Sequence, residues 1–175
     1  MVVLLGVAGV ACFSTIASAA HSTRVALAPV HIPALPSKNE STTGSCPIPA
    51  RFRPAFVRAA HDTGFQLSML VAVAQVESRF KVDARSAADA RGLLQVTPTT
   101  AAELKLNVND PASNVLAGAR YLRLMLDRFQ RTDLALAAYN AGPTIVDRLG
   151  HAPTQETQTY IANVQRRWAA LAGCN

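Results

Sequence analysis

The sequence predicts a single, all-α domain. Several stretches carry apolar residues at helical spacing, and each is bounded by residues that typically start or stop helices. No segment shows the period-two alternation of a half-buried strand. The chain has 175 residues, of which 50% are hydrophobic, so it can bury one sizeable core but is too short for two independent ones.

The first two expected helices lie close together in the sequence. Pro54 suits the first position of a helix that runs to about Asp62, with Gly64 just beyond its end. From Met69 to Val76 the only polar side chain is Gln75, and a helix that is apolar nearly all round belongs inside a domain. We expect Ser68 to cap this second helix and Glu77 to end it.

The next helices are predicted from their start signals. Thr97 is expected to cap a short helix from Pro98 to Leu104, and Asp110 is expected to start a long one at Pro111. The apolar residues of the long helix fall at spacings of four, three, four and three, which makes one core face: Val115, Ala119, Leu122, Leu126 and Phe129.

The C-terminal part is predicted to hold three further helical segments. Asp133 is expected to cap a helix that runs through Ala141 and is broken by Gly142-Pro143, and residues 145–149 form another brief turn. The final helix is expected over residues 155–172. Four apolar side chains at helical spacing are expected to form its buried side: Ile161, Val164, Trp168 and Leu171.

Glu77 is the strongest candidate for a catalytic residue. Helical spacing puts it on the face of Leu70, Val73 and Ala74, so its carboxyl group points towards the core. Desolvation and the negative end of the helix both raise the pKa of a carboxyl group there. A carboxylic acid that stays protonated near neutral pH suits a general acid. The alternative is a structural residue at a helix end that pairs with Arg79.

Three motifs occur in order: Glu77-Ser78 on the buried helix, residues 92–95 (Gly-Leu-Leu-Gln), and residues 138–142 (Ala-Tyr-Asn-Ala-Gly). Together they resemble the lysozyme-like catalytic domain of the soluble lytic transglycosylases (SLT), which is similar in fold to goose-type lysozyme. The resemblance covers about residues 52–164. It implies a single lysozyme-like helical domain with a catalytic cleft.

The resemblance also implies a reaction. Lytic transglycosylases cleave the β-1,4 bond between N-acetylmuramic acid (MurNAc) and N-acetylglucosamine (GlcNAc) in peptidoglycan. The 6-hydroxyl of MurNAc attacks its own anomeric carbon, so the product carries a 1,6-anhydro end. One carboxyl group is enough for this lyase-type cleavage: Glu77 would first protonate the leaving oxygen and then accept the proton of the attacking hydroxyl.

The motifs carry further expected site residues. By resemblance, Ser78 forms a hydrogen bond near the sugar's N-acetyl group or to the cleft backbone, and Gln95 reaches the substrate. Tyr139 is expected to orient Glu77 through its hydroxyl group, or else to be a core aromatic residue. Asn140 is expected to hold the cleft wall or a sugar.

A fourth motif spans Glu156 to Tyr160, and by resemblance both residues line the same groove. The alternative for Glu156 is a favourable charge in the first turn of a helix.

Two other functions remain open from the sequence. A goose-type lysozyme is a hydrolase, in which Asp83 or Asp89 would position a water molecule for attack. A non-catalytic peptidoglycan-binding accessory domain is the other alternative, although such a domain has no need of a buried acid.

The N-terminal segment of the sequence predicts that the protein is exported. Residues 1–20 contain no charged side chain and end in Ala17-Ser18-Ala19-Ala20, the small-residue pattern of a signal-peptide cleavage site. An uncleaved membrane anchor is the alternative and would associate the protein with a membrane. Residues 21–45 are rich in Pro, Ser and Thr and predict a linker, which leaves residues 46–175 for the catalytic domain. The expected location is the periplasm, the cell wall or the extracellular space.

Two cysteines flank the predicted domain. In an exported protein, Cys46 and Cys174 are expected to form a disulfide, with two free thiols as the alternative.

Charge and composition limit the partners. The net charge of +6 comes from fourteen Arg and three Lys against eleven acidic residues, and it suits an anionic polymer such as cell wall with its peptide carboxylates. No nucleic-acid recognition motif is present. The four histidines lack metal-ligand spacing and no glycine-rich phosphate loop occurs, so no metal and no cofactor are expected. We expect a monomer that acts on peptidoglycan glycan strands.

Overall fold

The computed structural model describes residues 44–175. The expected signal or anchor segment and nearly all of the expected linker lie outside these residues. The described part is helical, with isolated bridges at residues 85, 91 and 96 and no strand. Its elements are η1 (Ala50–Phe52), α1 (Arg53–Thr63), α2 (Leu67–Glu77), α3 (Pro98–Glu103), α4 (Pro111–Phe129), α5 (Thr132–Ala141), α6 (Pro143–Leu149) and α7 (Gln155–Ala170).

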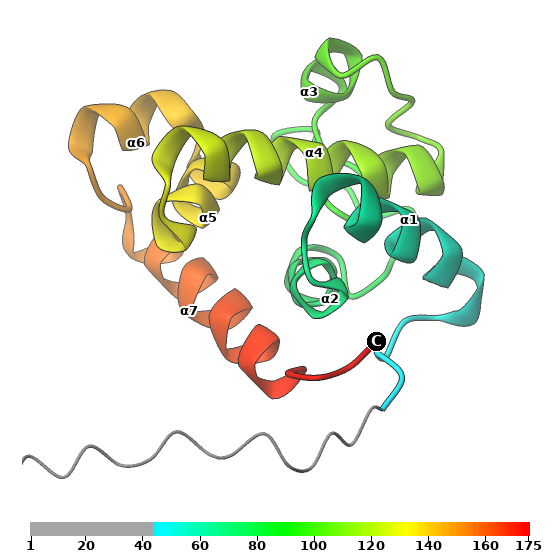
Figure 1. The fold of residues 1–175 in the computed structure, drawn as a ribbon. Helices are drawn as coiled ribbons and strands as arrows, with labels where there is room; N and C mark the ends of the chain where they lie inside the picture. The colour runs from blue at the N-terminus through cyan, green and yellow to red at the C-terminus, as the bar shows by residue number, and fades with distance from the viewer. Residues whose placement is uncertain (1–43) are drawn as a thin grey trace, which may run out of the picture. The chain divides into compact units, whose positions relative to one another are not determined.

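Helix α2 lies at the centre of the fold. It packs against α1 and α7, while α4 crosses above it and contacts α1 and α5 (Figure 1). Each residue from Met69 to Ala74 is at most 3% exposed. The burial of this stretch on all sides therefore follows from its apolar composition, as the sequence predicted. The end of α2, at Glu77, is held by the helices packed around it.

A second, smaller apolar cluster joins the end of α4 to α5 and α6. Its buried residues are Met125, Ala135, Ala137, Ala138 and Val146. Gly142 separates α5 from α6 with a φ of 90°, which a residue with a side chain rarely adopts. This cluster fixes the end of α5, where Tyr139 and Asn140 lie.

Two of the expected helix caps are confirmed. The Thr97 hydroxyl accepts a hydrogen bond from the backbone N–H of Thr100 (3.2 Å) at the start of α3. At the start of α4, Asp110 Oδ2 accepts one from the N–H of Ser113 (2.7 Å). Both satisfy a backbone donor that the first turn leaves without a partner.

The two other expected caps are wrong. Helix α2 begins at Leu67 after an extended Gln66, so Ser68 lies inside the first turn and is buried. Helix α5 begins at Thr132, which places Asp133 within the helix, where its carboxylate accepts two hydrogen bonds from Arg131. In both places the helix starts earlier than the polar residue suggested.

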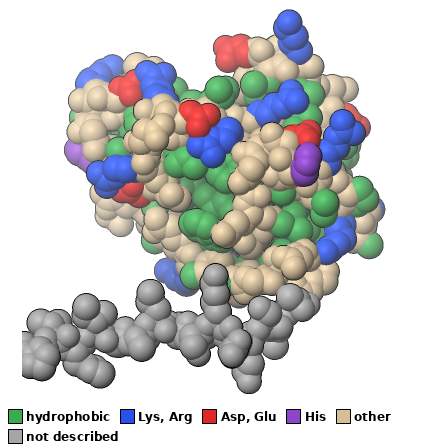
Figure 2. All heavy atoms as spheres, in the orientation of Figure 1, with side chains coloured by type: hydrophobic (Ala, Val, Ile, Leu, Met, Phe, Trp, Pro, Cys, Tyr) green, Lys and Arg blue, Asp and Glu red, His purple; other side chains and the backbone are tan. Residues whose placement is uncertain are grey.

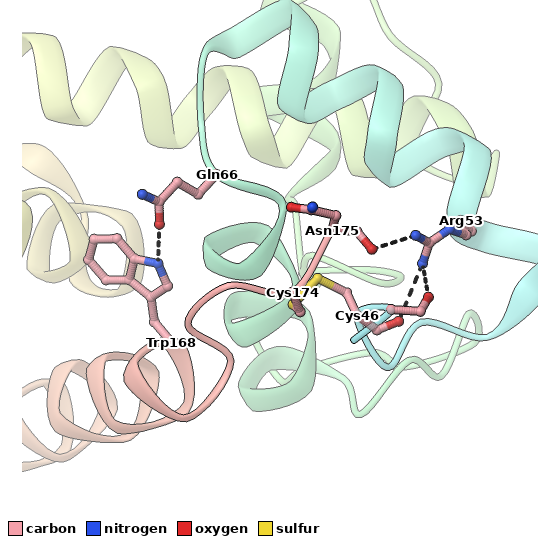
Figure 3. The surroundings of a disulfide bond; sticks show 7 residues. Cys46, Arg53, Gln66, Trp168, Cys174 and Asn175 are labelled. Carbon is pink, nitrogen blue, oxygen red and sulfur yellow. Dashed lines mark hydrogen bonds between the residues drawn. A yellow bond between two sulfur atoms is a disulfide. The ribbon is translucent and has the colours of Figure 1, made fainter. Parts of the chain in front are cut away.

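The ends of the described chain are joined. Cys46 and Cys174 form a disulfide across 128 residues of sequence, beside the guanidinium of Arg53 (Figure 3). Arg53 donates hydrogen bonds to the Ser45 hydroxyl (2.7 Å) and to the Asn175 backbone oxygen (2.5 Å). The segment after α7 is therefore fastened to the segment before α1.

The final helix ends at Ala170, slightly before the expected boundary. Val164 is fully buried, whereas Ile161, Trp168 and Leu171 are only partly buried against the core. Within residues 44–175, no helix is long and apolar enough to cross a membrane.

Candidate active site

Glu77 is the last residue of α2 and faces a pocket of about 210 Å³. The pocket is lined by residues from the loop after α2, from the start of α3 and from the end of α5: Glu77, Ser86, Ala88, Ala90, Gln95, Thr97, Tyr139 and Asn140. Of these residues, Glu77 alone carries a carboxyl group. Among residues 44–175, Glu77 makes no ion pair with Arg79. The alternative that Glu77 is a helix-end residue paired with Arg79 is therefore wrong.

Burial raises the pKa of Glu77 from 4.5 to about 7. The Tyr160 hydroxyl donates a hydrogen bond to Glu77 Oε1 (2.7 Å), which stabilises the carboxylate and offsets part of the effect of burial. Near neutral pH the protonated and ionised forms of Glu77 are thus comparably populated. A group in that condition is able both to give and to accept a proton.

The contact with Glu77 that was expected of Tyr139 is made by Tyr160. The Tyr139 hydroxyl donates to the backbone oxygen of Leu94 (2.6 Å), so the expectation that Tyr139 orients Glu77 through its hydroxyl group is wrong. Tyr160, from the middle of α7, makes that contact instead. Burial, together with the nearby Glu77 charge, raises the pKa of both tyrosines well above the usual value, so both remain protonated donors.

Ser78 fastens the loop after α2 to the helix end. Its side chain is buried, and its hydroxyl donates to the backbone oxygen of Leu93 (2.8 Å). This position matches the expectation of a hydrogen bond to the backbone of the cleft. Through this hydrogen bond, the Ser78 side chain holds the 92–95 motif against the end of α2.

Gln95 holds the same loop from the pocket side. Its Nε2 donates to the backbone oxygens of Ala84 (3.1 Å) and Gly92 (3.0 Å). Because both partners are acceptors, the amide nitrogen must face them, and Oε1 remains as an acceptor. The backbone of Gln95 has a φ of 46°, a conformation uncommon for residues other than glycine.

Asn114, which the sequence analysis did not single out, holds the 91–94 turn in place. Its Oδ1 accepts from the Leu94 N–H (2.9 Å), and its Nδ2 donates to the backbone oxygens of Arg91 (2.8 Å) and Val108 (3.2 Å). A Cβ atom on Gly92 would lie 2.7 Å from Asn114 Nδ2, which explains the glycine. The sequence signal that could have identified Asn114 is its place next to Val115 on the apolar face of α4, where a polar side chain needs a hydrogen-bond partner.

The Glu77 pocket is the middle part of a longer groove. Gln95, Thr97, Tyr139 and Asn140 also line a neighbouring pocket of about 250 Å³ that reaches Tyr121 on α4. On the other side, Asn140 borders a pocket of about 350 Å³ that includes both Glu156 and Tyr160 of α7. In Figure 2 the surface is hollowed at its upper edge, between the part that carries α6 and the part that carries α3.

The two aspartates of the lysozyme alternative lie outside the Glu77 pocket. Asp89 accepts hydrogen bonds from Arg91 Nε (3.0 Å) and Nη2 (2.7 Å) and also pairs with Arg85. The hydrogen bond from Arg91 lowers the pKa of Asp89. Asp83 is exposed on the loop. Among residues 44–175, no three His, Cys, Asp or Glu side chains are grouped to hold a metal ion.

Comparison with known proteins gives a family match and solved relatives. The family model of the transglycosylase SLT domain matches residues 54–161. The lytic transglycosylase Slt from Pseudomonas aeruginosa, solved as an inactive Glu-to-Gln mutant, is 30% identical and superposes over 73% of this chain and 25% of its own with a TM-score of 0.63. The 70 kDa soluble lytic transglycosylase from Escherichia coli is 27% identical over 67% of this chain and 23% of its own, with a TM-score of 0.61.

Sequence relatives agree with these structures. "Membrane-bound lytic murein transglycosylase F" from Desulfosudis oleivorans is 40% identical over 132 residues, which are 69% of this chain and 27% of that protein. The protein of the same name from Cellvibrio japonicus is 38% identical over 96 residues, 50% of this chain and 19% of that protein. The chain thus spans roughly a fifth to a quarter of these relatives, and its match to the family model shows that it belongs to the transglycosylase SLT domain family, with a lysozyme-like helical fold.

Proposed function

We propose that this domain is a peptidoglycan lytic transglycosylase that cleaves the β-1,4 bond between MurNAc and GlcNAc and leaves 1,6-anhydro-MurNAc ends. The observation that carries the proposal is the setting of Glu77. It is the one carboxyl group lining its pocket, its pKa is about 7, and it accepts a hydrogen bond from Tyr160. Relatives named lytic transglycosylases support the same reaction.

The chemistry needs one group that acts twice. Protonated Glu77 gives its proton to the glycosidic oxygen as the bond to the anomeric carbon breaks. The resulting carboxylate then accepts the proton of the 6-hydroxyl of MurNAc as that oxygen bonds to the anomeric carbon, which closes the anhydro ring. The Tyr160 hydroxyl stabilises the carboxylate between the two steps, and a pKa near 7 suits both.

The other residues would shape the groove. Gln95 offers Oε1 to a sugar hydroxyl or amide N–H, and Asn140 lies at the junction of all three pockets, where it can contact sugars on either side of the cleaved bond. Glu156 lines the exposed end near Tyr160. Ser78 and Tyr139 act through the 92–95 loop, because both donate to its backbone.

The hydrolase alternative has less support. A goose-type mechanism needs a second carboxylate to activate water. Asp89 instead forms ion pairs with Arg91 and Arg85, and neither Asp89 nor Asp83 lines the Glu77 pocket. A purely binding domain would have no use for a carboxyl group whose pKa is raised by burial.

We further propose that the domain is exported and acts as a monomer. The disulfide suits an oxidising compartment, which supports export, while the monomeric state stays a prediction. Membrane association through residues 1–20 stays a prediction, supported by the name "membrane-bound" of several relatives.

The test is digestion of purified peptidoglycan followed by mass spectrometry of the released muropeptides. Wild-type protein should release anhydro ends, which differ from reducing ends by one water. Glu77→Gln preserves shape but removes the transferable proton, so it should abolish release while the circular dichroism spectrum stays unchanged. Asp83→Asn and Asp89→Asn should each retain most activity.

Two results would overturn the proposal. Full activity of Glu77→Gln would remove Glu77 from the mechanism. Reducing ends in the wild-type digest, combined with an Asp variant as inactive as Glu77→Gln, would establish the hydrolase.

A further inference from the structure

The groove continues along α7 beyond the proposed catalytic residue. Asn163 borders both the pocket that contains Tyr160 and a further pocket of about 310 Å³ lined by Asn163, Arg166, Arg167 and Ala170. The residues of α7 that line these two pockets include Glu156, Tyr160, Asn163, Arg167 and Ala170, at spacings of four, three, four and three. One face of α7 therefore runs from the Glu77 contact to Arg167, and Arg166 lines the same last pocket beside it.

The two arginines are held by neutral groups. Arg166 Nη1 donates to Asn163 Oδ1 (3.3 Å), and Arg167 Nη1 donates to Gln75 Oε1 on α2 (3.4 Å). Neither forms an ion pair with a carboxylate of residues 44–175, whereas six other arginines of this part do. Both arginines are exposed, and no carboxylate of residues 44–175 offsets the positive charge at this end of the groove.

Position and charge together indicate a ligand. Arg167 lies seven positions after Tyr160 on α7, which is about 10 Å along the helix axis. Arg167 is thus too far away to act on the bond that Glu77 attacks, but it can reach a group attached to the same strand. A guanidinium offers a planar pair of donors that matches a carboxylate. Glu156, at the other end of this face, repels carboxylates and so favours the arginine end.

We propose that Arg166 and Arg167 form a carboxylate subsite, which binds the free carboxylates of the peptide attached to the glycan strand beside the cleaved bond. The inference rests on the proposed function, because it assumes that the strand lies in the groove. It makes the domain selective for strands that carry charged peptides.

The experiment compares two substrates that differ only in charge. One is a soluble peptidoglycan strand with intact peptides, and the other is the same strand after its peptide carboxyl groups have been converted to amides. Wild-type protein, the double variant Arg166→Gln/Arg167→Gln and the control variant Arg148→Gln are assayed on both. Arg148 is a matched control, because it is also exposed in the last turn of a helix but lines none of the groove pockets.

Wild-type protein and Arg148→Gln should cleave the native strand with a kcat/KM about threefold to tenfold higher than the amidated strand. In the double variant this preference should disappear through a higher KM on the native strand, with kcat unchanged, because the arginines contribute binding and not chemistry. Raising the salt concentration should reduce the wild-type preference and leave the double variant unaffected.

Each contrary result has a separate meaning. Equal cleavage of the two strands by wild-type protein, or a preference that survives in the double variant, overturns the subsite while the proposed function stands. Absence of anhydro products from both strands overturns the proposed function itself.

Discussion

Tyr160 and Glu77 form the interaction on which the proposed proton chemistry depends. The phenol O–H stabilises the carboxylate, while burial favours the neutral acid, and burial has the larger effect. The pKa of about 7 is therefore a balance of two opposing causes, which side-chain substitutions can separate.

Tyr160→Phe should lower activity and shift its pH dependence. Glu77 must begin protonated, so the rate of cleavage should fall as pH rises through its pKa. Loss of the hydroxyl removes the effect that lowers the pKa of Glu77, so the alkaline limb of the pH–rate profile should move to higher pH. The lost contact should also cost about 1 to 3 kcal/mol in the transition state, which is roughly a fivefold to 150-fold fall in rate. Steady-state assays between pH 5 and 9 measure both effects.

Tyr139→Phe is the matched control. It removes a hydroxyl that donates to the Leu94 backbone and not to Glu77, so its alkaline limb should stay in place. An alkaline limb that moves in Tyr139→Phe and not in Tyr160→Phe would contradict the assignment of the two tyrosines.

Glu77 should also make stability depend on pH. Its pKa is higher in the folded protein than in the unfolded chain, so between pH 4.5 and 7 the folded state holds more protons. The contribution of Glu77 to stability is thus retained below pH 4.5, decreases as pH rises to about 7 and is constant above it. Relative to Glu77→Gln, the free energy of unfolding of the wild type should fall by up to about 3 kcal/mol across this window. Urea unfolding of both proteins at pH 4.5 and 8 checks this, and an equal difference at both pH values would contradict it.

At this scale the sequence predicted the raised pKa of Glu77 but not the residue that donates a hydrogen bond to it. An apolar helix ending in Glu77 was enough to predict a raised pKa, because burial follows from the composition of that helix. Which tyrosine reaches Glu77 depends on how α5 and α7 are rotated and packed against α2, and that is set by contacts between distant residues. Asn114 was missed for the same reason, because its partners are backbone groups about 6 to 23 positions away.

At the scale of elements, α4 and the 92–95 loop approach each other closely at Gly118. A Cβ atom there would lie 2.5 Å from Leu94 Cβ and 2.9 Å from the Tyr139 hydroxyl oxygen. Leu94 is fully buried, and its backbone oxygen accepts the hydrogen bond from Tyr139, so none of these atoms has room to move freely.

Gly118→Ala should therefore destabilise the protein although alanine favours helices. The gain in helix propensity is up to about 1 kcal/mol, while overpacking of this kind typically costs about 1 to 3 kcal/mol. Activity should fall as well, because displacement of Leu94 moves the loop that carries Gln95. Thermal melting and the muropeptide assay measure the two effects. Arg120→Ala, at an exposed position on the same helix, is the control and should change neither; a Gly118→Ala protein as stable and active as wild type would refute the close approach.

The helices themselves were largely predictable, since their signals are local. Thr97 and Asp110 cap the helices that follow them, as expected from residue type and spacing. Ser68 and Asp133 were wrongly predicted to be helix caps. Ser68 is instead buried within α2, and Asp133 lies within α5 and pairs with Arg131. A cap residue is recognised locally, but tertiary contacts decide whether it is used.

At the scale of the whole molecule, the sequence predicted the fold class, and the resemblance predicted a cleft and several of its residues, but neither predicted how the helices pack to form it. The groove combines the end of α2, the end of α5 and one face of α7, which are separated by more than 80 positions at the Glu77–Tyr160 contact. Its continuation to Arg167 depends on the packing of α7 against α2, where Gln75 holds the guanidinium. The order of motifs in the sequence does not contain this geometry.

The disulfide links the two ends of this assembly, and its removal should lower stability without unfolding the domain. Closing a loop of this length restricts the unfolded chain, which corresponds to at most about 4 to 5 kcal/mol in the chain-entropy model. Cys46 is buried in the core around α2 and Cys174 packs against that core, but the helices of the core also pack directly on one another, and Tyr160 reaches Glu77 through the packing of α7 on α2. Reduction should therefore lower the melting temperature but preserve the helical spectrum and most of the activity at 25 °C.

Melting curves with and without a thiol-free reductant test this expectation, with Cys46→Ser/Cys174→Ser as the matched variant. The variant should melt at the temperature of the reduced wild type and should not respond to the reductant. Iodoacetamide labelling of the unreduced, denatured protein provides the independent check. If both cysteines of residues 44–175 are labelled, the bond does not form in the purified protein, and the stability of the domain must come from the helical core alone.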